Sequence, residues 1–160
     1  MKEPPAKINV DDPRPSLGPI YRYLEEAKKL IADMLQDMED RQFIETSTSA
    51  WLSPIILVNK PDGSKRMSLD YRHVNKHLAT DIYPLPRLEE LVDQAAGHQF
   101  YATLDMREAY FQILLEENSR DLTVFSDIIT LYGFRRLPFG LTCSPAIFTR
   151  HMASLLLLGT

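Results

Sequence analysis

Two segments of this chain combine residue types that could bind a nucleotide and a metal ion. Residues 103–110 place a carboxylate, Asp105, directly after the mainly apolar residues 100–104. Residues 137–148 place a glycine-bearing turn directly before a predicted helix start at Ser144. A carboxylate at the end of a buried strand is costly unless a metal ion, a cation or water compensates its charge. Asp105 is therefore the first candidate for a functional acid.

The chemistry that Asp105 suggests is phosphoryl or nucleotidyl transfer. Such sites use carboxylates to hold Mg²⁺, which bridges phosphate oxygens and, in two-metal sites, stabilises both the attacking and the leaving oxygen. One carboxylate does not decide the matter, because an aspartate at a strand end is often simply solvated. Tyr110 follows five residues later, where its ring could lie beside the sugar of a bound nucleotide and exclude a 2′-hydroxyl. The alternative is that Tyr110 and Phe111 are ordinary core aromatics.

A predicted β-hairpin could supply cations to the same site. Residues 55–59 and 66–71 are apolar or alternating, and the turn between them contains Gly63. This pattern indicates a hairpin, which would carry Lys60 on one arm and Arg66 on the other. Two cations could then converge on an anion near the tip, although charged hairpin tips are also often solvated.

Three helices are predicted around this hairpin. Residues 21–41 carry apolar residues at steps of three and four, which predicts an amphipathic helix. Residues 86–97 predict a second helix that leads into the strand before Asp105, and Ser144 is expected to cap a third. Residues 1–19 hold five of the eleven prolines, so they are predicted to form an extended or disordered leader outside the core.

The composition indicates one domain. The chain has 160 residues with 44% hydrophobic content, which is enough to bury a single core. Its longest apolar run, residues 155–158, is far shorter than the roughly 20 residues that span a membrane. Because the N-terminus does not resemble a signal peptide, the expected location is cytoplasmic or nuclear. Cys143 is predicted to be a small apolar residue, and His73 and His77 polar surface residues rather than zinc ligands.

The charge is unevenly distributed along the chain. A net charge of −4 argues against strong non-specific binding of nucleic acid by the chain as a whole. Five basic and two acidic side chains lie between residues 60 and 77, whereas seven acidic and three basic side chains lie between residues 25 and 45. We therefore expect nucleic acid to meet the basic hairpin, while the acidic helix need not face it.

Four ordered motifs resemble the fingers and palm of reverse transcriptases from gypsy-like LTR retrotransposons. They are residues 53–76 with the hairpin, residues 83–87 before the leucine-rich helix, residues 103–110, and residues 137–148. The resemblance implies an α+β fold with an antiparallel palm sheet and packed helices, in which residues 20–160 form the fingers and part of the palm after a leader at 1–19. It also implies an RNA-directed DNA polymerase, which transfers nucleotides from dNTPs to a primer 3′ end on an RNA or DNA template.

The resemblance also implies residue roles. It makes Asp105 the catalytic, metal-binding carboxylate, with the Met106 carbonyl as a supporting ligand and Mg²⁺ as the cofactor, Mn²⁺ being an alternative. The implied dNTP site consists of Lys60, Arg66, the backbone N–H groups of Glu108 and Ala109, the sugar gate Tyr110, and the pocket residues Phe139 and Gly140. The implied template contacts are Asp70, Arg72 and Asn75.

The resemblance is incomplete at one point. The family carries a second acidic motif, with two adjacent aspartates on a hairpin after the last helix, and the sequence reaches Thr160 without it. Asp11 and Asp12 are adjacent, but they precede the palm, and Pro13 directly after them would break the strand of such a hairpin. The chain is therefore expected to be truncated and not to polymerise alone.

The expected partners are an RNA or DNA template-primer, dNTPs and the remaining polymerase regions, namely the palm hairpin, the thumb and RNase H. No membrane partner is expected. The alternative to a polymerase fragment is a non-catalytic remnant that binds nucleic acid or protein.

Overall fold

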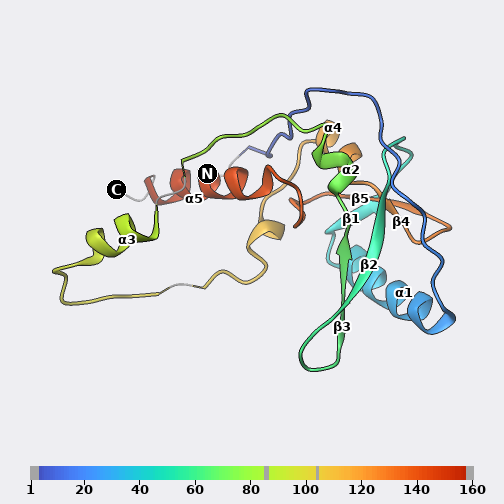
Figure 1. The fold of residues 1–160 in the computed structure, drawn as a ribbon, viewed down its shortest axis with the longest axis horizontal. Coiled ribbons are helices and arrows are strands. Elements are labelled where there is room, and N and C mark those ends of the chain that lie inside the picture. Colours follow the sequence, from blue (N-terminus) through green and yellow to red (C-terminus); the bar gives the residue numbers. More distant parts are fainter. Residues whose placement is uncertain (1–3, 85–86, 104, 158–160) are drawn as a thin grey trace.

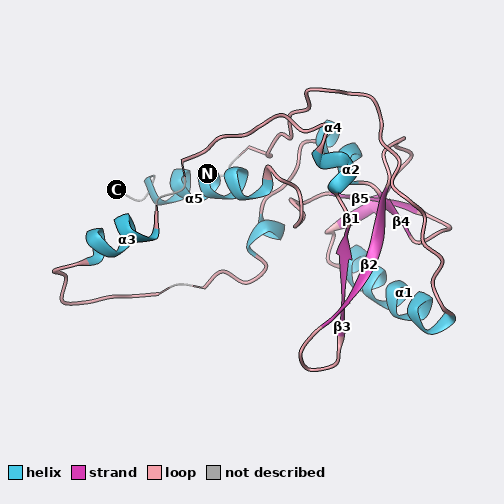
Figure 2. Cartoon of the chain, viewed as in Figure 1, coloured by secondary structure: helices cyan, strands magenta, loops and turns pink. Residues whose placement is uncertain are grey.

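The computed structural model describes residues 4–84, 87–103 and 105–157. Five strands form one sheet in the order β1-β5-β4-β2-β3. The strands are β1 (Ile44–Thr46), β2 (Ser53–Asn59), β3 (Lys65–Leu69), β4 (Phe125–Ser126) and β5 (Leu131–Phe134). The helices are α1 (Glu25–Asp40), α2 (Arg72–Asn75), α3 (Leu88–Ala95), α4 (Glu117–Arg120) and α5 (Ser144–Leu157), with 3₁₀ turns η1 (Ala109–Gln112) and η2 (Asp121–Thr123). Figure 2 shows this α+β arrangement, which confirms the predicted fold class.

The sheet is mixed. The pairs β1–β5, β4–β5 and β2–β3 are antiparallel, whereas β2 and β4 run parallel. The antiparallel expectation thus holds for three of the four pairings. The parallel pair is possible because a long stretch of chain separates β2 from β4, and parallel strands need such a crossover connection.

The predicted hairpin is confirmed and projects away from the rest of the sheet (Figure 1). β2 and β3 pair from Ile55 opposite Leu69 to the end of the hairpin. Gly63 in the turn has a φ of +81°, a left-handed conformation that glycine adopts without steric cost. Asp62 accepts hydrogen bonds from both the N–H and the hydroxyl of Ser64, which closes the turn.

Helix α1 lies within the predicted range of residues 21–41. Ile31 and Leu35 are each 2% exposed, and they identify the face that joins the core. Leu24, by contrast, precedes the helix and is 82% exposed. Only the middle of the predicted apolar stripe is therefore fully buried.

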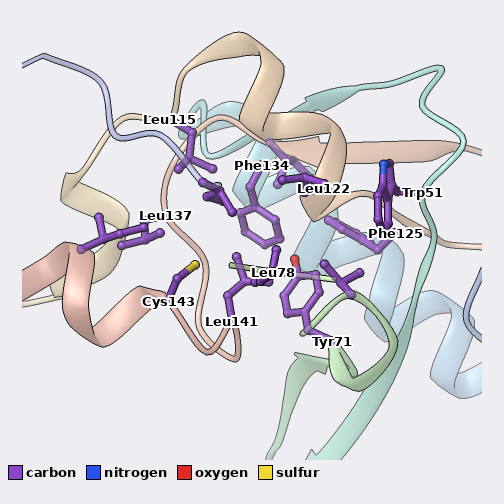
Figure 3. Close-up of a cluster of buried hydrophobic side chains, with 14 of the residues drawn as sticks. Trp51, Tyr71, Leu78, Leu115, Leu122, Phe125, Phe134, Leu137, Leu141 and Cys143 are labelled. Atoms are coloured by element: carbon purple, nitrogen blue, oxygen red, sulfur yellow. The ribbon is translucent and has the colours of Figure 1, made fainter. Parts of the chain in front are cut away.

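The core joins the sheet to α2 and to the segments before α5. Figure 3 shows Tyr71 and Phe125 among aliphatic side chains from several elements. The Tyr71 hydroxyl donates to the Thr123 carbonyl at 3.0 Å, so the polar atom of this buried ring is satisfied. Cys143 is 5% exposed, and burial raises the pKa of its thiol to about 11. The prediction that Cys143 serves as a small apolar residue is confirmed.

The proline-rich leader is extended, but the prediction that it lies outside the core is wrong. Ile8 is 4% exposed, and its N–H donates to the Ser119 hydroxyl at 2.9 Å. Isolated β-bridges at Ala6, Val10 and Leu17 attach the leader to separate parts of the fold. Proline restricts φ and removes an N–H donor, which excludes a helix but still allows an extended segment to pack.

His77 accepts backbone hydrogen bonds from this leader and is partly buried. The prediction that it is a polar surface residue is therefore wrong. Its carbonyl accepts hydrogen bonds from the N–H groups of Asp11 and Asp12. Its ring lies edge-on to Trp51 at 5.3 Å between centroids, and its Nδ1 lies 3.4 Å from Oδ2 of Asp12. The adjacent aspartates therefore belong to the packing of the leader.

We expect Ile8→Ala to lower the free energy of unfolding by about 2–3 kcal/mol, because it removes a buried aliphatic side chain and leaves a cavity. Leu17→Ala is a matched control in the same leader, since Leu17 is 68% exposed, and its effect should stay below about 0.5 kcal/mol. Urea unfolding followed by far-ultraviolet circular dichroism measures both values. Equal losses would contradict the anchoring role of Ile8.

Helices α3 and α5 confirm the two helices predicted in the second half of the chain, with differences in detail. Val92 in α3 is 60% exposed, so this part of the predicted apolar face is not buried. Ser144 is the first residue of α5 rather than the residue before it, and its hydroxyl donates to the Pro138 carbonyl at 2.8 Å. That bond instead ties the start of α5 to the glycine-bearing turn. Among the described residues, no helix has the length and apolar character needed to cross a membrane.

Candidate nucleotide-binding site

The hairpin, α1 and the turns at Glu108 and Phe139 line a cavity of about 770 Å³. The hairpin contributes three cations to its wall, Lys60, Lys65 and Arg66. The other lining residues are Asp33, Met34, Asp37, Met38, Met67, Ser68, Leu69, Glu108, Phe111, Phe134, Pro138 and Phe139. A cavity of this size is in the range of small-molecule sites. Its wall combines apolar surface with three cations and three carboxylates, so an anion that carries an aromatic group would bind on the hairpin side, where the cations lie.

The two cations singled out from the sequence lie on the same cavity. Arg66 pairs with Val58 across the hairpin, and the Lys60 N–H donates to the Ser64 carbonyl at 2.7 Å at the turn. Among the ion pairs of the described residues, none involves Lys60, Arg66 or the neighbouring Lys65. Their charges are therefore available to a bound anion.

The strand predicted before Asp105 is not formed. Residues 100–103 carry no strand, and Phe100 and Tyr101 are 91% and 68% exposed. Leu104 lies outside the described residues. A strand is stable only when it pairs with a neighbour, and no described segment pairs with residues 100–103. The local apolar pattern was therefore not sufficient to form the strand.

Asp105 lies exposed in an open loop, and neither it nor Met106 lines the cavity. Carboxylate and carbonyl oxygens are ligands that Mg²⁺ prefers, and this ion commonly binds through one or two carboxylates together with substrate phosphates and water. Asp105 and Met106 thus fit an ion that arrives with a triphosphate. The described part of the chain gathers no group of three or more His, Cys, Asp or Glu side chains that could hold a metal ion. A site for two metal ions would therefore need further carboxylates, beyond those that the described residues bring together.

Glu108 turns the chain into η1 and lines the cavity. Its backbone is left-handed, with φ 51° and ψ 44°, which is uncommon for a residue other than glycine. Its carboxylate forms an ion pair with Arg41 at the C-terminal end of α1. The N–H of Ala109, at the first position of η1, has no partner within that helical turn. The turn therefore brings a carboxylate and a backbone donor close to one another.

Tyr110 is held between aromatic neighbours. Its ring stacks on Phe139 at 4.7 Å between centroids and an interplanar angle of 28°, and it lies 5.2 Å from the Phe148 ring. Phe139 also lies edge-on to Phe111 at 5.5 Å. The roles of sugar gate and core aromatic are not exclusive here, because Tyr110 packs against the core while its stacking partner Phe139 lines the cavity.

Gly140 and Asn75 hold the glycine-bearing turn against the base of the hairpin. Gly140 has a φ of +97°, and a Cβ there would lie 3.3 Å from Cδ2 of Tyr71, so both the backbone conformation and the close approach favour glycine. Nδ2 of Asn75 donates to the Gly140 carbonyl at 3.0 Å, and its Oδ1 accepts from the Thr142 N–H at 3.0 Å. Both ends of the Asn75 amide are therefore already engaged.

Arg72 is the exposed member of the three predicted template contacts. Its side chain is 80% exposed, whereas that of Asp70 is 4% exposed. The Arg72 guanidinium donates to both carboxylate oxygens of Asp70, and these bonds lower the pKa of Asp70. Asp70 and Asn75 are thus placed to position other groups, while Arg72 presents its side chain to solvent.

Three features of the site were missed at the sequence level. Asp33 and Asp37 of the acidic helix line the cavity, although we had no reason to expect this helix at the site. Arg41 reaches Glu108 across 67 positions, a separation for which no local pattern exists. Lys65 also lines the cavity, and its place beside Arg66 in the hairpin is the signal that could have identified it.

The chain matches one known protein family. Residues 58–158 match the family described as reverse transcriptase (RNA-dependent DNA polymerase). The chain belongs to the reverse transcriptase family. The match covers well over half of its 160 residues, and it includes most of the hairpin, the segment around Asp105 and the glycine-bearing turn of this reverse transcriptase domain.

The relatives of this reverse transcriptase domain include polyproteins of transposons and viruses. It is 36% identical over 152 residues to the retrovirus-related Pol polyprotein from transposon 412 of Drosophila melanogaster, covering 91% of this chain and 12% of that protein. It is 34% identical over 158 residues to the enzymatic polyprotein of cauliflower mosaic virus (strain Strasbourg), covering 92% of this chain and 22% of that protein. The predicted resemblance to retrotransposon reverse transcriptases is confirmed. The chain spans less than a quarter of the length of either relative.

Solved reverse transcriptases share the fold. The crystal structure of the prototype foamy virus protease-reverse transcriptase matches with a TM-score of 0.79 at 29% identity, covering 92% of this chain and 20% of that one. A foamy viral protease-reverse transcriptase in complex with an RNA/DNA hybrid matches with a TM-score of 0.73 at 27% identity, covering 97% and 21%. These matches confirm a reverse transcriptase fold for the domain.

Proposed function

We propose that this domain takes part in RNA-directed DNA synthesis and binds the dNTP in the cavity between the hairpin and the turns at Glu108 and Phe139. One observation carries the proposal. Lys60, Arg66, Glu108 and Phe139 come from three segments far apart in the sequence, and they line one cavity. All four belong to the dNTP site that the sequence resemblance implies.

The proposed roles follow from charge and position. Lys60 and Arg66 bind the triphosphate oxygens, because cations stabilise these groups as negative charge develops on them. The backbone N–H groups of Glu108 and Ala109 donate to the same anion. Phe139 lines the cavity and would contact the base and sugar, while Gly140, which is not among the lining residues, would hold the turn that carries Phe139.

The sugar and the metal ion are assigned to the segment from Asp105 to Tyr110. Tyr110, stacked on Phe139, would meet a 2′-hydroxyl and exclude it. Asp105 and the Met106 carbonyl would hold Mg²⁺ or Mn²⁺. When bound, the ion neutralises charge on the reacting phosphate oxygens.

Template contact is proposed for Arg72, whose exposed guanidinium suits a phosphate of the template strand. Asp70 and Asn75 would hold the backbone and the glycine-bearing turn beside it. Foamy viral relatives have been solved with dsDNA and with an RNA/DNA hybrid, which supports an RNA or DNA template-primer as the partner. The palm hairpin, thumb and RNase H regions, and the division into a leader at 1–19 and a polymerase part at 20–160, belong to the same proposal.

A second candidate is a non-catalytic module that binds nucleic acid or protein. The open loop around Asp105 favours it, because that loop has no strand to hold the carboxylate in place. The two candidates differ in a measurable way. A polymerase domain binds dNTPs through Lys60 and Arg66, whereas a remnant that has lost the reaction need not.

We expect Lys60→Ala and Arg66→Ala each to raise the Kd for an Mg²⁺-loaded fluorescent dNTP about tenfold, or about 1.4 kcal/mol, because each removes a charge-assisted contact to the triphosphate. Fluorescence anisotropy with the 160-residue chain measures the Kd. Lys29→Ala and Arg22→Ala are matched controls, since both side chains are exposed and neither lines the cavity. Equal effects of all four variants would contradict binding at the hairpin.

A further inference from the structure

Arg41 connects α1 with the turn that carries Glu108. It forms an ion pair with the Glu108 carboxylate, and its Nη1 lies 3.3 Å from Oδ2 of Asp37. Its guanidinium carbon lies 4.3 Å from the centre of the Phe43 ring. Because the guanidinium is a rigid planar fork, these three contacts orient it well despite its partial exposure.

The pairing matters because Glu108 lines the cavity that also contains Lys60 and Arg66. An unpaired carboxylate there would repel a triphosphate and would compete with it for the hairpin cations. Arg41 itself is absent from the cavity lining. Its charge therefore acts on the Glu108 and Asp37 carboxylates rather than on a ligand in the cavity.

The same contact fixes the backbone. Glu108 adopts a left-handed conformation that costs free energy for a residue with a Cβ and persists only where surrounding contacts enforce it. The ion pair to Arg41 supplies such a contact from a different element of the fold. It thereby holds the peptide groups that lead into η1.

We propose that Arg41 is a positioning residue of the triphosphate site, which neutralises the Glu108 carboxylate and holds the turn that presents the Ala109 N–H. This inference rests on the proposed function of the cavity. It adds a residue from the end of α1, outside the hairpin and the palm motifs. Isolated exposed ion pairs contribute little to stability, so the main effect of Arg41 falls on ligand affinity.

The test measures the Kd for an Mg²⁺-loaded fluorescent dNTP in the 160-residue chain. Arg41→Ala raises this Kd about fivefold to tenfold, or about 1.0–1.4 kcal/mol, because it leaves Glu108 unpaired. In a background that combines Glu108→Gln with Asp37→Asn the same substitution changes the Kd less than about twofold, since neither of the carboxylates that Arg41 pairs with remains. Arg41→Lys retains the charge but not the planar fork, so it recovers only part of the affinity.

Arg14→Ala is the matched control. Arg14 forms an exposed ion pair with Asp12 in the leader and does not line the cavity. Its replacement leaves the Kd within about twofold of the unsubstituted chain. Urea unfolding of every variant separates a loss of affinity from a loss of folded protein.

The outcomes separate this inference from the function on which it rests. An equal loss from Arg41→Ala in both backgrounds would overturn it in favour of direct contact with the ligand. Unchanged affinity in Arg41→Ala, while Lys60→Ala and Arg66→Ala still weaken binding, would overturn the role of Arg41 and leave the proposed function standing. A loss of affinity accompanied by a fall of similar size, in kcal/mol, in the free energy of unfolding would assign Arg41 a general structural role. Absence of saturable binding by the unsubstituted chain would overturn both.

Discussion

Asp105→Asn is expected to reduce primer extension about 10³-fold in a longer polymerase that joins this chain to a family-like palm hairpin with two adjacent aspartates and a thumb. In-line attack on a triphosphate gathers negative charge that cations and metal ions must stabilise. A neutral amide is a much poorer ligand for a hard cation than a carboxylate. Removing a single preorganised electrostatic partner already costs roughly 10²–10³ in rate at other sites. Single-nucleotide incorporation on an RNA template with Mg²⁺ measures the effect.

Asp93→Asn is the control for this substitution, because Asp93 is exposed on α3 and has no assigned role in the site. It should leave extension unchanged. The 160-residue chain alone should show no extension, since one carboxylate does not hold two metal ions. Robust extension by that chain, surviving Asp105→Asn, would show that the chemistry has been assigned to the wrong residue. An extended polymerase that binds dNTPs but never extends would favour the non-catalytic alternative.

Tyr110→Ala is expected to lower discrimination against ribonucleotides about 10²-fold in the same extended polymerase. The ring of Tyr110 is fixed by stacking on Phe139 and by contact with Phe148, so it cannot easily move aside for a 2′-hydroxyl. Steric exclusion by one side chain is typically worth about 10–200-fold between similar substrates. The ratio of kcat/KM for dCTP to that for CTP measures discrimination, because these nucleotides differ only in the 2′-hydroxyl.

Tyr110→Phe separates the gate from a role in packing. It keeps the ring and removes only the hydroxyl, so discrimination should remain close to that of the unsubstituted polymerase. Tyr110→Ala also leaves a cavity beside Phe139 and Phe148, which should destabilise the domain by about 2–4 kcal/mol. Assays are therefore run well below the unfolding midpoint. Full discrimination in folded Tyr110→Ala would sink the gate assignment and leave Tyr110 as a core aromatic.

Local sequence patterns predicted the elements whose formation depends on interactions between residues that are close in the sequence. The hairpin followed from alternating residues around Gly63, whose φ of +81° requires little more than the absence of a Cβ. Helix α1 followed from apolar residues at helical spacing, and Ile31 and Leu35 are indeed buried. The same kind of pattern gave a wrong prediction where a strand needs a neighbouring strand to form. Residues 100–103 have strand-like composition but no described strand beside them.

The leader shows the opposite error. Its prolines indicated an extended chain, and the chain is extended, but composition does not reveal which residue packs. Ile8 reaches the core and donates its N–H to Ser119, 111 positions away. Likewise Ser144 has the residue type of a helix cap, yet its hydroxyl bonds the Pro138 carbonyl, because the turn before α5 brings that acceptor within reach.

Amino-acid order alone was sufficient to recognise the family and to nominate its nucleotide-site residues, since residue types and short spacings are explicit in the sequence. The folded chain decided which of them meet. It placed Lys60, Arg66, Glu108 and Phe139 on one cavity and left Asp105 in an open loop. It also joined Arg41 to Glu108. Contacts between distant segments depend on how whole elements pack, and no periodicity within a single element encodes that packing.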